Sequence, residues 1–302
     1  MTTRAAVCTL LMNGRAGAFR HKAGIAQMQQ VIRELNLDIE VVGTRSRDEM
    51  VTRLRQAAEK GGRVAVAGGD GTVGLAVQEL ARTETALGIV AQGTANNFAT
   101  ALRLPQDLPS ALRLLVEGEA RPVDLGHVEV PGKPARYFTE SAGIGLFADA
   151  LSLYGSKSNK NYLKAAWYLP RLWLTARPRT LRLHIDNQVV TERAVLLEAA
   201  NSYRMSYALP LAPDAKVTDG LLDLVVLGDL HRRELIPYYR AIRAQLHRGL
   251  PKVEMHKART VQIETRHKIP VHADDKVVGT TGKAPVTVSC VPRALRVLLD
   301  RL

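Results

Sequence analysis

A short glycine-rich stretch, Gly68-Gly69-Asp70-Gly71-Thr72, carries the clearest chemical signal in the sequence. Glycine lets the backbone approach a bulky anion because no Cβ atom stands in the way. An apolar strand pattern precedes the stretch and a helical pattern starts at Val73, so a helix N-terminus with free N–H groups would face that anion. The stretch therefore predicts a phosphate-binding turn, with an ordinary tight turn between a strand and a helix as the alternative.

Two side chains in this stretch refine the prediction. Asp70 is unusual beside a phosphate because two anions repel each other. It fits either a divalent cation placed between the two charges or a role in organising the turn through hydrogen bonds. Thr72 is expected either to cap the following helix or to contact a phosphate oxygen.

The residues around this turn alternate between strand and helix patterns. The expected strands are 5–12, 39–42, 64–67 and 87–91, and the expected helices are 23–35, 48–60, one from 73 to about 80, and one from 110 to 117. The expected helix caps are Ser46 or Arg47-Asp48 for the helix at 48–60 and Ser110 for the helix at 110–117. This order implies a parallel sheet with right-handed crossovers, whose ligands bind beyond the carboxyl ends of the strands. The loops at Asn13, Thr44, Gly68 and Gly93 should converge there.

After Arg121-Pro122 the pattern changes to short strands divided by turns. The expected strands are 123–130, 137–142, 180–186, 188–200, 221–227, 260–264, 269–272 and 285–291. Helices are expected at about 160–176 and 231–248, and 293–302 is a short amphipathic stretch. The second part is therefore expected to be an antiparallel, β-rich domain.

Composition limits the environment and the partners. The 302 residues suffice for one large or two ordinary domains, and the net charge of +13 indicates an anionic partner: nucleic acid, an anionic membrane surface or a phosphorylated ligand. Two distant cysteines, Cys8 and Cys290, offer no disulfide framework and no zinc pattern, so a cytoplasmic setting is expected. No apolar run is long enough for a transmembrane helix.

A second motif, Gly93-Thr94-Ala95-Asn96-Asn97-Phe98-Ala99, follows the glycine turn. Together the two motifs resemble the nucleotide-binding signature of the diacylglycerol and sphingosine kinase superfamily, in its bacterial soluble branch. Further segments that resemble this family are Pro122–Gly126, Ser141–Gly145 (a glycine turn in the family), Ala212–Ala215, Thr218–Leu222 and Val291–Val297.

The resemblance implies an α/β plus β fold. A phosphofructokinase-like or NAD-kinase-like nucleotide-binding catalytic domain is expected at 1–125, with a C-terminal return at about 291–302. An antiparallel β-sandwich that receives the lipid substrate is expected at 126–290. The implied reaction is transfer of the ATP γ-phosphate to a lipid hydroxyl, with ATP and Mg²⁺ as cofactors.

The family's nucleotide site can be placed residue by residue on this sequence. The residues expected to bind nucleotide are Asn13, Gly14, Gly17, Thr44, Gly68, Gly69, Asp70, Gly71, Thr72, Val73, Gly93, Thr94 and Asn96. Asp70 and Asp124 are expected near the catalytic magnesium, although Asn97 replaces the acidic residue that usually completes their network. From the residues alone, Thr44 and Thr94 fit helix caps equally well.

A second metal is implied near Asp219. In the family this segment holds a structural Mg²⁺ through the carboxylate and through main-chain carbonyls, here those of Lys216 and Leu221. Ca²⁺ also suits carbonyl ligands. The alternative is a plain Asp-Gly hairpin turn.

The family's catalytic base comes from an Asp-Gly-Glu turn, which here is Asp274-Asp275-Lys276. The expected base is therefore Asp274, with Asp275 as the alternate, because a lysine cannot act as a carboxylate base. A solvated acidic turn is the alternative. The sequence departs from the family pattern at Gly74, at Asn97 and in this turn. These departures keep two other functions open. One is a nucleotide- or lipid-binding protein without efficient kinase activity, and the other is a kinase for another hydroxylated metabolite.

Two basic regions suit an anionic membrane surface. Residues 154–182 interleave basic residues with both tryptophans, and a second cluster covers 231–252. Packing of the aromatic residues on the sandwich, with the charges solvated, is the alternative. A lipid substrate is expected, and peripheral association with an anionic membrane surface stays open beside that alternative. Nucleic acid is not expected as a partner, because no binding motif supports it. A homodimer also stays open.

Overall fold

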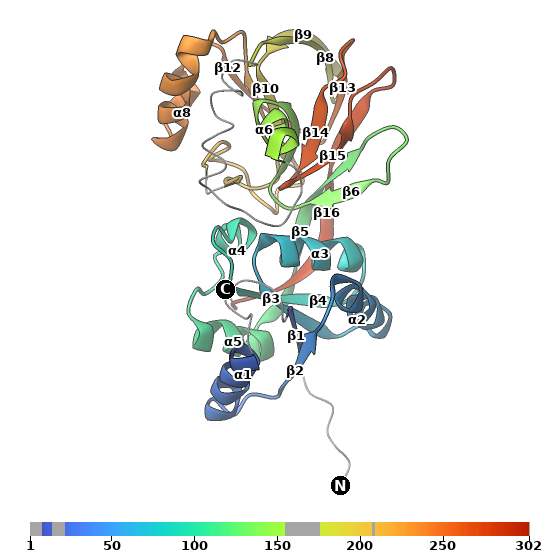
Figure 1. The fold of residues 1–302 in the computed structure, drawn as a ribbon, viewed down its shortest axis with the longest axis vertical. Helices are drawn as coiled ribbons and strands as arrows, with labels where there is room; N and C mark the ends of the chain where they lie inside the picture. The colour runs from blue at the N-terminus through green and yellow to red at the C-terminus, as the bar shows by residue number, and fades with distance from the viewer. Residues whose placement is uncertain (1–7, 14–21, 155–175, 207–208, 302) are drawn as a thin grey trace. The chain divides into compact units, whose positions relative to one another are not determined.

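The computed structural model describes residues 8–13, 22–154, 176–206 and 209–301 (Figure 1). The chain divides into two compact units, one formed by Met1–Asp124 with Arg293–Leu302 and the other by Leu125–Pro292. Gly14, Gly17 and most of the basic and aromatic segment at 154–182 lie outside the described residues.

The first unit is built on a parallel sheet in the order β2-β1-β3-β4, which β16 extends beside β4. Its strands are β1 (Cys8–Asn13), β2 (Ile39–Thr44), β3 (Arg63–Gly68), β4 (Ala86–Ala91) and the C-terminal part of β16 (Val286–Leu299). Its helices are α1 (Lys22–Glu34), α2 (Arg47–Lys60), α3 (Asp70–Leu80), α4 (Asn97–Ala101) and α5 (Leu108–Glu117). The predicted order of strands and helices is confirmed from β1 to α5.

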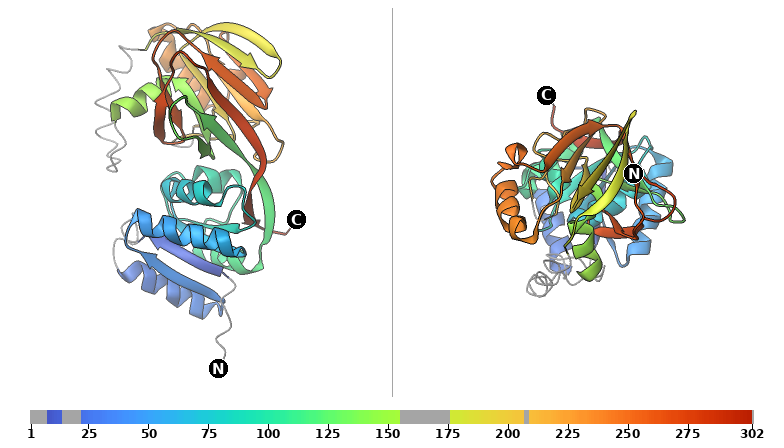
Figure 2. Two further views of the ribbon diagram at one scale, coloured as in Figure 1. Left: turned by 90° about the vertical axis from the view of Figure 1, so that its right-hand side faces the viewer. Right: turned by 90° about the horizontal axis from the view of Figure 1, so that it is seen from above.

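Helices cover both faces of this sheet (Figure 2). Met28 and Ile32 of α1 and Leu112 and Leu115 of α5 share one apolar core with the side chains of β1, β3 and β4 that point to that face. The helices α2 and α3 pack against each other and against the sheet. A sheet buried on both faces needs nearly continuous apolar strands, which is the pattern of β3 and β4.

Three helix starts test the predicted caps. The Ser46 hydroxyl accepts the Glu49 N–H at 3.1 Å and caps α2, as predicted. The cap of α5 is Asp107, whose carboxylate accepts the N–H of Ser110, so the prediction of Ser110 as the cap was wrong. The helix α3 begins at Asp70 with Gly69 as its N-cap, so Thr72 lies inside the first turn and is not a cap.

The second unit consists of two antiparallel sheets, one ordered β16-β13-β8-β9 and the other β12-β11-β10-β7-β14-β15. The strands not yet given are β5 (Glu119–Glu129), β6 (Arg136–Phe138), β7 (Ser141–Gly145), β8 (Arg179–Ile185), β9 (Gln188–Ala194), β10 (Leu196–Ala200), β11 (Leu222–Leu227), β12 (Val253–Ala258), β13 (Thr260–Glu264), β14 (Pro270–Ala273) and β15 (Lys276–Thr280). The helical segments are α6 (Leu146–Tyr154), η2 (Arg232–Glu234), α8 (Leu235–Arg243) and η3 (His247–Gly249).

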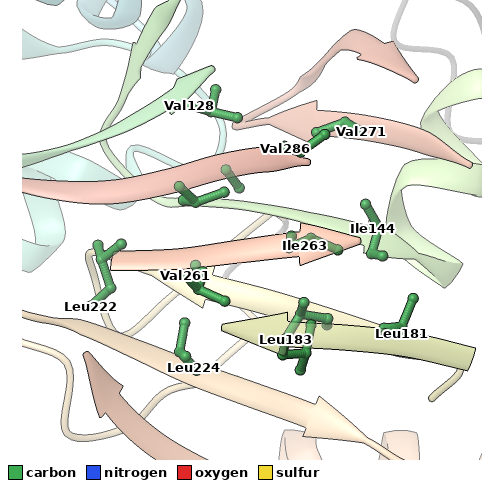
Figure 3. Packing of buried hydrophobic residues seen from close by; sticks show 14 of the residues in the cluster. Val128, Ile144, Leu181, Leu183, Leu222, Leu224, Val261, Ile263, Val271 and Val286 are labelled. Carbon is green, nitrogen blue, oxygen red and sulfur yellow. The ribbon is translucent and has the colours of Figure 1, made fainter. Parts of the chain in front are cut away.

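One apolar core joins the two sheets of this unit (Figure 3). Leu183 of β8 and Val261 of β13 come from one sheet, and Ile144 of β7, Leu224 of β11 and Val271 of β14 come from the other. Sheets that bury one face each against the other form a sandwich. The predicted α/β plus β-sandwich fold is thereby confirmed.

Several predicted elements have different bounds. The single strands expected at 137–142 and 188–200 are each two strands, because the chain changes partner near Thr139 and at Val195. Ser141–Gly145 is a strand rather than a turn, and 293–299 continues β16. The helix expected at 231–248 is three shorter segments. Within the described ranges, every helix is too short or too polar to cross a bilayer.

Candidate active site

Two glycine loops meet where β3 and β4 end. A Cβ atom on Gly69 would lie 2.9 Å from the Cα of Gly93, and a Cβ atom on Gly93 would lie 2.5 Å from the Cα of Gly69. The strands are neighbours in parallel register, and Gln92 N–H donates to the Gly68 carbonyl at 2.9 Å. Both positions therefore require glycine, which explains why the two motifs occur together in the sequence.

Asn96 shapes the second of these loops. It caps α4 in the left-handed region with φ 49°, a conformation that asparagine tolerates better than most residues. Its Oδ1 accepts the Gly93 N–H at 2.9 Å and its Nδ2 donates to the Gly93 carbonyl at 3.0 Å. Asn96 was predicted to bind nucleotide; in the structure its amide holds Gly93 against Gly69. Thr94, in the same loop, is exposed.

The start of α3 leaves room for a ligand beside Gly71. The N–H groups of Thr72 and Val73 donate to the Gly69 carbonyl at 2.8 and 3.1 Å, so they are part of the turn. Gly71 is exposed, and a Cβ atom placed on it would have no other atom within 4 Å. Val73 is only 3% exposed, so its side chain belongs to the core. The chain itself therefore places no steric demand for glycine at position 71.

The other predicted nucleotide residues lie at the ends of β1 and β2. Asn13 and Thr44 are in register at the carboxyl ends of these two strands. The buried Thr44 hydroxyl donates to the Met12 carbonyl at 3.1 Å, so it ties the two strands together. Since Ser46 caps α2, the alternative role of Thr44 as a helix cap is excluded.

Asp70 and Asp124 are the two carboxylates predicted near the catalytic magnesium. Asp70 is the first residue of α3, where a helix favours negative charge. Asp124 is 2% exposed, and its Oδ1 accepts the Arg293 N–H at 2.8 Å, so it joins β5 to β16. Hard carboxylate oxygens fit Mg²⁺ in chemistry, and Asp70 at the glycine turn is the better placed of the two to hold it with a phosphate.

In the second unit, Asp274 sits at a tight turn between β14 and β15. It adopts a left-handed conformation with φ 50°. Its carboxylate accepts the Thr139 N–H at 3.1 Å and the Glu140 N–H at 2.8 Å. Burial raises the pKa of Asp274 to about 6; those two N–H groups oppose the shift and the neighbouring Asp275 charge adds to it. Asp275 itself is exposed.

A buried ion pair supports this turn from behind. The Nε2 atom of His272 lies 2.8 Å from a Glu198 carboxylate oxygen, and its Nδ1 lies 3.0 Å from the Asp274 carbonyl. Both side chains are 0% exposed. Burial alone lowers the pKa of His272, but the Glu198 charge and hydrogen bond raise it overall. Both ring nitrogens face acceptors, but a neutral imidazole has only one N–H. The Glu198–His272 pair must therefore carry one proton more than a neutral imidazole and a carboxylate would.

Gly143 makes this pair possible. It stands in register with Glu198 on one side and with His272 on the other. A Cβ atom on Gly143 would lie 2.7 Å from the Glu198 Oε2. The pair was missed in the sequence, where its signal was a lone glutamate inside the otherwise apolar strand 196–200.

The predicted structural metal site contains a lysine instead. Asp219 Oδ1 accepts the Leu221 N–H at 3.2 Å, and the Lys257 ammonium donates to Oδ2 at 2.8 Å. Lys216 is exposed. Among the described residues, no three His, Cys, Asp or Glu side chains are grouped to hold a metal ion. The Lys257 ammonium thus lies where a cation would contact the Asp219 carboxylate, and its positive charge disfavours a divalent ion there.

The sequence matches two family models. Residues 7–128 match the diacylglycerol kinase catalytic domain, and residues 155–299 match the YegS C-terminal NAD kinase beta sandwich-like domain. A diacylglycerol kinase of Mycobacterium tuberculosis is 30% identical over 270 residues, which cover 87% of this chain and 85% of the relative. The chain belongs to the diacylglycerol kinase family. A Bacillus subtilis diacylglycerol kinase is 25% identical over 89% of both chains.

Solved structures confirm the fold of this diacylglycerol kinase family member. A diacylglycerol kinase from Bacillus anthracis has a TM-score of 0.72 at 21% identity and covers 99% of this chain and 98% of its own. An NAD kinase from Archaeoglobus fulgidus, solved in complex with ATP, has a TM-score of 0.53 at 12% identity, covering 97% of this chain and 94% of its own. The predicted resemblance to a lipid kinase family is confirmed, and family membership supports a kinase with a lipid substrate.

Proposed function

We propose that this protein transfers the γ-phosphate of ATP to the hydroxyl of a diacylglycerol or a closely related lipid at a membrane surface. The observation that carries the proposal is the close approach of Gly69 and Gly93, which accounts for the coupled motifs of the family. We assign nucleotide binding and catalysis to 1–125 with 291–302, and lipid binding to 126–290.

In this proposal the β3–α3 turn binds the nucleotide phosphates. The N-terminus of a helix attracts anions through the positive end of its dipole and through N–H groups that precede those of Thr72 and Val73, which bond the Gly69 carbonyl. Gly71 leaves the approach open, and Asp70 would hold Mg²⁺ beside the phosphates. That ion would neutralise charge on the transferred phosphoryl group. Asn13, Gly14, Gly17, Thr44 and Thr94 are proposed to frame the rest of the nucleotide.

Asp274 is proposed to accept the proton of the attacking hydroxyl. The two N–H donors fix its carboxylate, and its pKa of about 6 leaves it ionised at neutral pH yet basic enough to take a proton. Asp275 is the alternate base because it is exposed in the same turn.

The helix α8 is proposed to contact an anionic bilayer. Tyr238 and Ile242 face the core, while Ile236, Tyr239 and Arg240 are exposed. Arg243 extends the exposed stripe at helical spacing. Exposed apolar side chains interleaved with arginine suit a lipid interface. The lipid that such a kinase phosphorylates resides in that interface.

The test is incubation of the protein with labelled ATP, Mg²⁺ and vesicles that contain diacylglycerol. Labelled phosphatidic acid is the expected product, and total membrane lipid extracts and soluble alcohols serve as alternative acceptors. ATP binding without transfer to any acceptor would contradict the proposal and favour a non-catalytic binding protein. Transfer to a soluble alcohol alone would identify a metabolite kinase.

A further inference from the structure

Lys257 lies between two carboxylates at the start of β11. Its Nζ atom is 2.8 Å from Asp219 Oδ2 and 3.2 Å from Asp223 Oδ2. Asp223 on β11 and Lys257 on β12 are directly opposite in the antiparallel register. Asp219 comes from the loop before β11, where Gly220 takes a left-handed φ of 73° and the Asp219 side chain accepts the Leu221 N–H. The ammonium therefore joins the loop to the sheet.

The charges of this cluster make the lysine necessary. The Asp223 side chain is 7% exposed, and a buried carboxylate is costly unless a positive charge compensates it. Burial raises the pKa of Asp223 and Lys257 opposes that shift. Lys257 contacts Asp223 at 3.2 Å and hydrogen-bonds Asp219 at the shorter distance of 2.8 Å. One ammonium thus serves two acidic groups.

We propose that the Lys257 ammonium is a built-in cation that takes the place of a structural divalent metal ion in this segment. The loop around Asp219 is then held in every condition, without Mg²⁺ or Ca²⁺. Removal of the lysine would uncover a metal site, because it would leave the Asp219 and Asp223 carboxylates within reach of one ion. Carboxylate oxygens are the donors that Ca²⁺ and Mg²⁺ prefer. This inference goes beyond the proposed function and does not depend on kinase activity.

The test compares thermal unfolding of the wild type and Lys257→Met, without nucleotide. The wild-type melting temperature is expected to stay the same in a chelator and in millimolar CaCl₂ at matched ionic strength. Lys257→Met is expected to melt lower by on the order of 2–8 °C in the chelator, because Asp223 loses its compensating charge. Millimolar CaCl₂ should recover at least half of that loss in the variant.

Two further variants sharpen the result. Lys252→Met removes an ammonium that, among the described residues, bonds the single carboxylate of Glu234 at 2.9 Å, so CaCl₂ should not rescue it. Asp223→Asn combined with Lys257→Met removes the buried charge with the lysine. This double variant should fold without CaCl₂, and CaCl₂ should not change its melting temperature. It therefore still tests the inference if Lys257→Met alone does not fold.

Two outcomes would overturn the inference. One is a wild-type melting temperature that falls in the chelator, which would mean that a metal ion is held there together with Lys257. The other is a response of Lys257→Met to CaCl₂ no larger than that of Lys252→Met.

Discussion

The carboxyl group of Asp274 is subject to opposing influences. Burial favours its neutral form, and the N–H groups of Thr139 and Glu140 favour its ionised form. With a pKa of about 6, a base at this position should make kcat/KM rise about tenfold per pH unit below 6 and level off above it. We expect Asp274→Asn to lower kcat by about 10²–10⁴-fold with little change in the KM for ATP. Steady-state kinetics from pH 5 to 8 would measure both.

Thermal stability provides the control for this variant. A raised carboxyl pKa contributes stability that is fully present below pH 3.8 and is lost as the pH rises through about 6. At pH 8 the ionised carboxylate therefore destabilises the folded protein. The melting temperature of Asp274→Asn at pH 8 should be at least as high as that of the wild type. Full activity of Asp274→Asn would refute the assignment of Asp274 as the base. Loss of activity in Asp275→Asn instead would identify Asp275 as the base.

The Glu198–His272 pair has its own pH signature. Since the pKa of His272 is raised above 6.5, the pair's stabilisation is fully present below pH 6.5 and is lost as the pH rises through the raised value. We expect Glu198→Ala to destabilise the protein by about 3–5 kcal/mol at pH 6, because it leaves a buried charge without a partner. In Glu198→Gln, the glutamine amide can donate to a neutral imidazole. This variant should therefore lose less stability than Glu198→Ala, and its melting temperature should fall less as the pH rises. Melting curves from pH 6 to 9 would check this.

Gly71 and Gly74 form a matched pair for testing the nucleotide site. A Cβ atom on either would have no other atom within 4 Å, so both alanine variants should fold. Each replaces a helical glycine, which should stabilise the helix by up to about 1 kcal/mol. If phosphates occupy the turn, Gly71→Ala should lower ATP affinity at least about tenfold, a loss of about 1.4 kcal/mol, while Gly74→Ala should not. Equal affinities in calorimetry would place the nucleotide elsewhere.

At the scale of elements, α8 makes a direct prediction about membranes. Arg240 and Arg243 are exposed in the last turn of α8, and each basic side chain near an anionic surface contributes about 1 kcal/mol. Reversing both charges to glutamate should weaken binding to anionic vesicles by more than about tenfold. Vesicle co-sedimentation would measure this, and high salt should weaken the wild type in the same direction.

Controls separate a membrane face from a merely solvated helix. Arg53→Glu changes one exposed charge on α2 and should have little effect. Tyr239→Ser removes an exposed aromatic ring without changing charge and should weaken binding at high salt as well. Unchanged binding in the Arg240→Glu, Arg243→Glu variant would leave α8 as an ordinary surface helix. Binding to neutral vesicles with equal strength would exclude an electrostatic mechanism.

Elements with a strong local signal could be predicted from the sequence. The apolar run before Gly68 and the cap at Ser46 depend on neighbouring residues alone, and both appear in the structure. Strand partners depend on distant residues, so the change of sheet at Val195 had no local signal. The helix α3 starts at Asp70 rather than at Val73, because its first turn contains glycine and aspartate, which carry no apolar helical pattern.

The candidate site shows the same division. The glycines at 69 and 93 were predictable because a motif reports a steric requirement directly. The Glu198–His272 pair and the Lys257 bridge were not, because each joins residues from separate strands that only the register brings together. Sequence could name the acidic residue at 219 but not the ammonium that lies against it.

At the scale of the whole molecule, the C-terminal part of β16 completes the first unit. Leu295, Val297 and Leu298 are at most 1% exposed, and Arg293 N–H bonds Asp124. Truncation after Pro292 should therefore destabilise the first unit by more than 4 kcal/mol in rough terms, since each buried leucine or valine contributes about 1.5–3 kcal/mol. Removal of Arg301 and Leu302 alone should have little effect. Circular dichroism and ATP binding of both truncations would check this.

The pairing of β16 with β4 also sets an order of events during synthesis. Ala86 and Arg296 are partners in the parallel register, yet the whole second unit lies between them in the chain. Domains normally fold as units as the chain emerges. Here the glycine turn is synthesised before the second unit, but the β4 edge of its sheet lacks its β16 partner until the second unit has been synthesised. The nascent chain must protect that edge throughout, so the first unit can close around its ligand only after the second has been made.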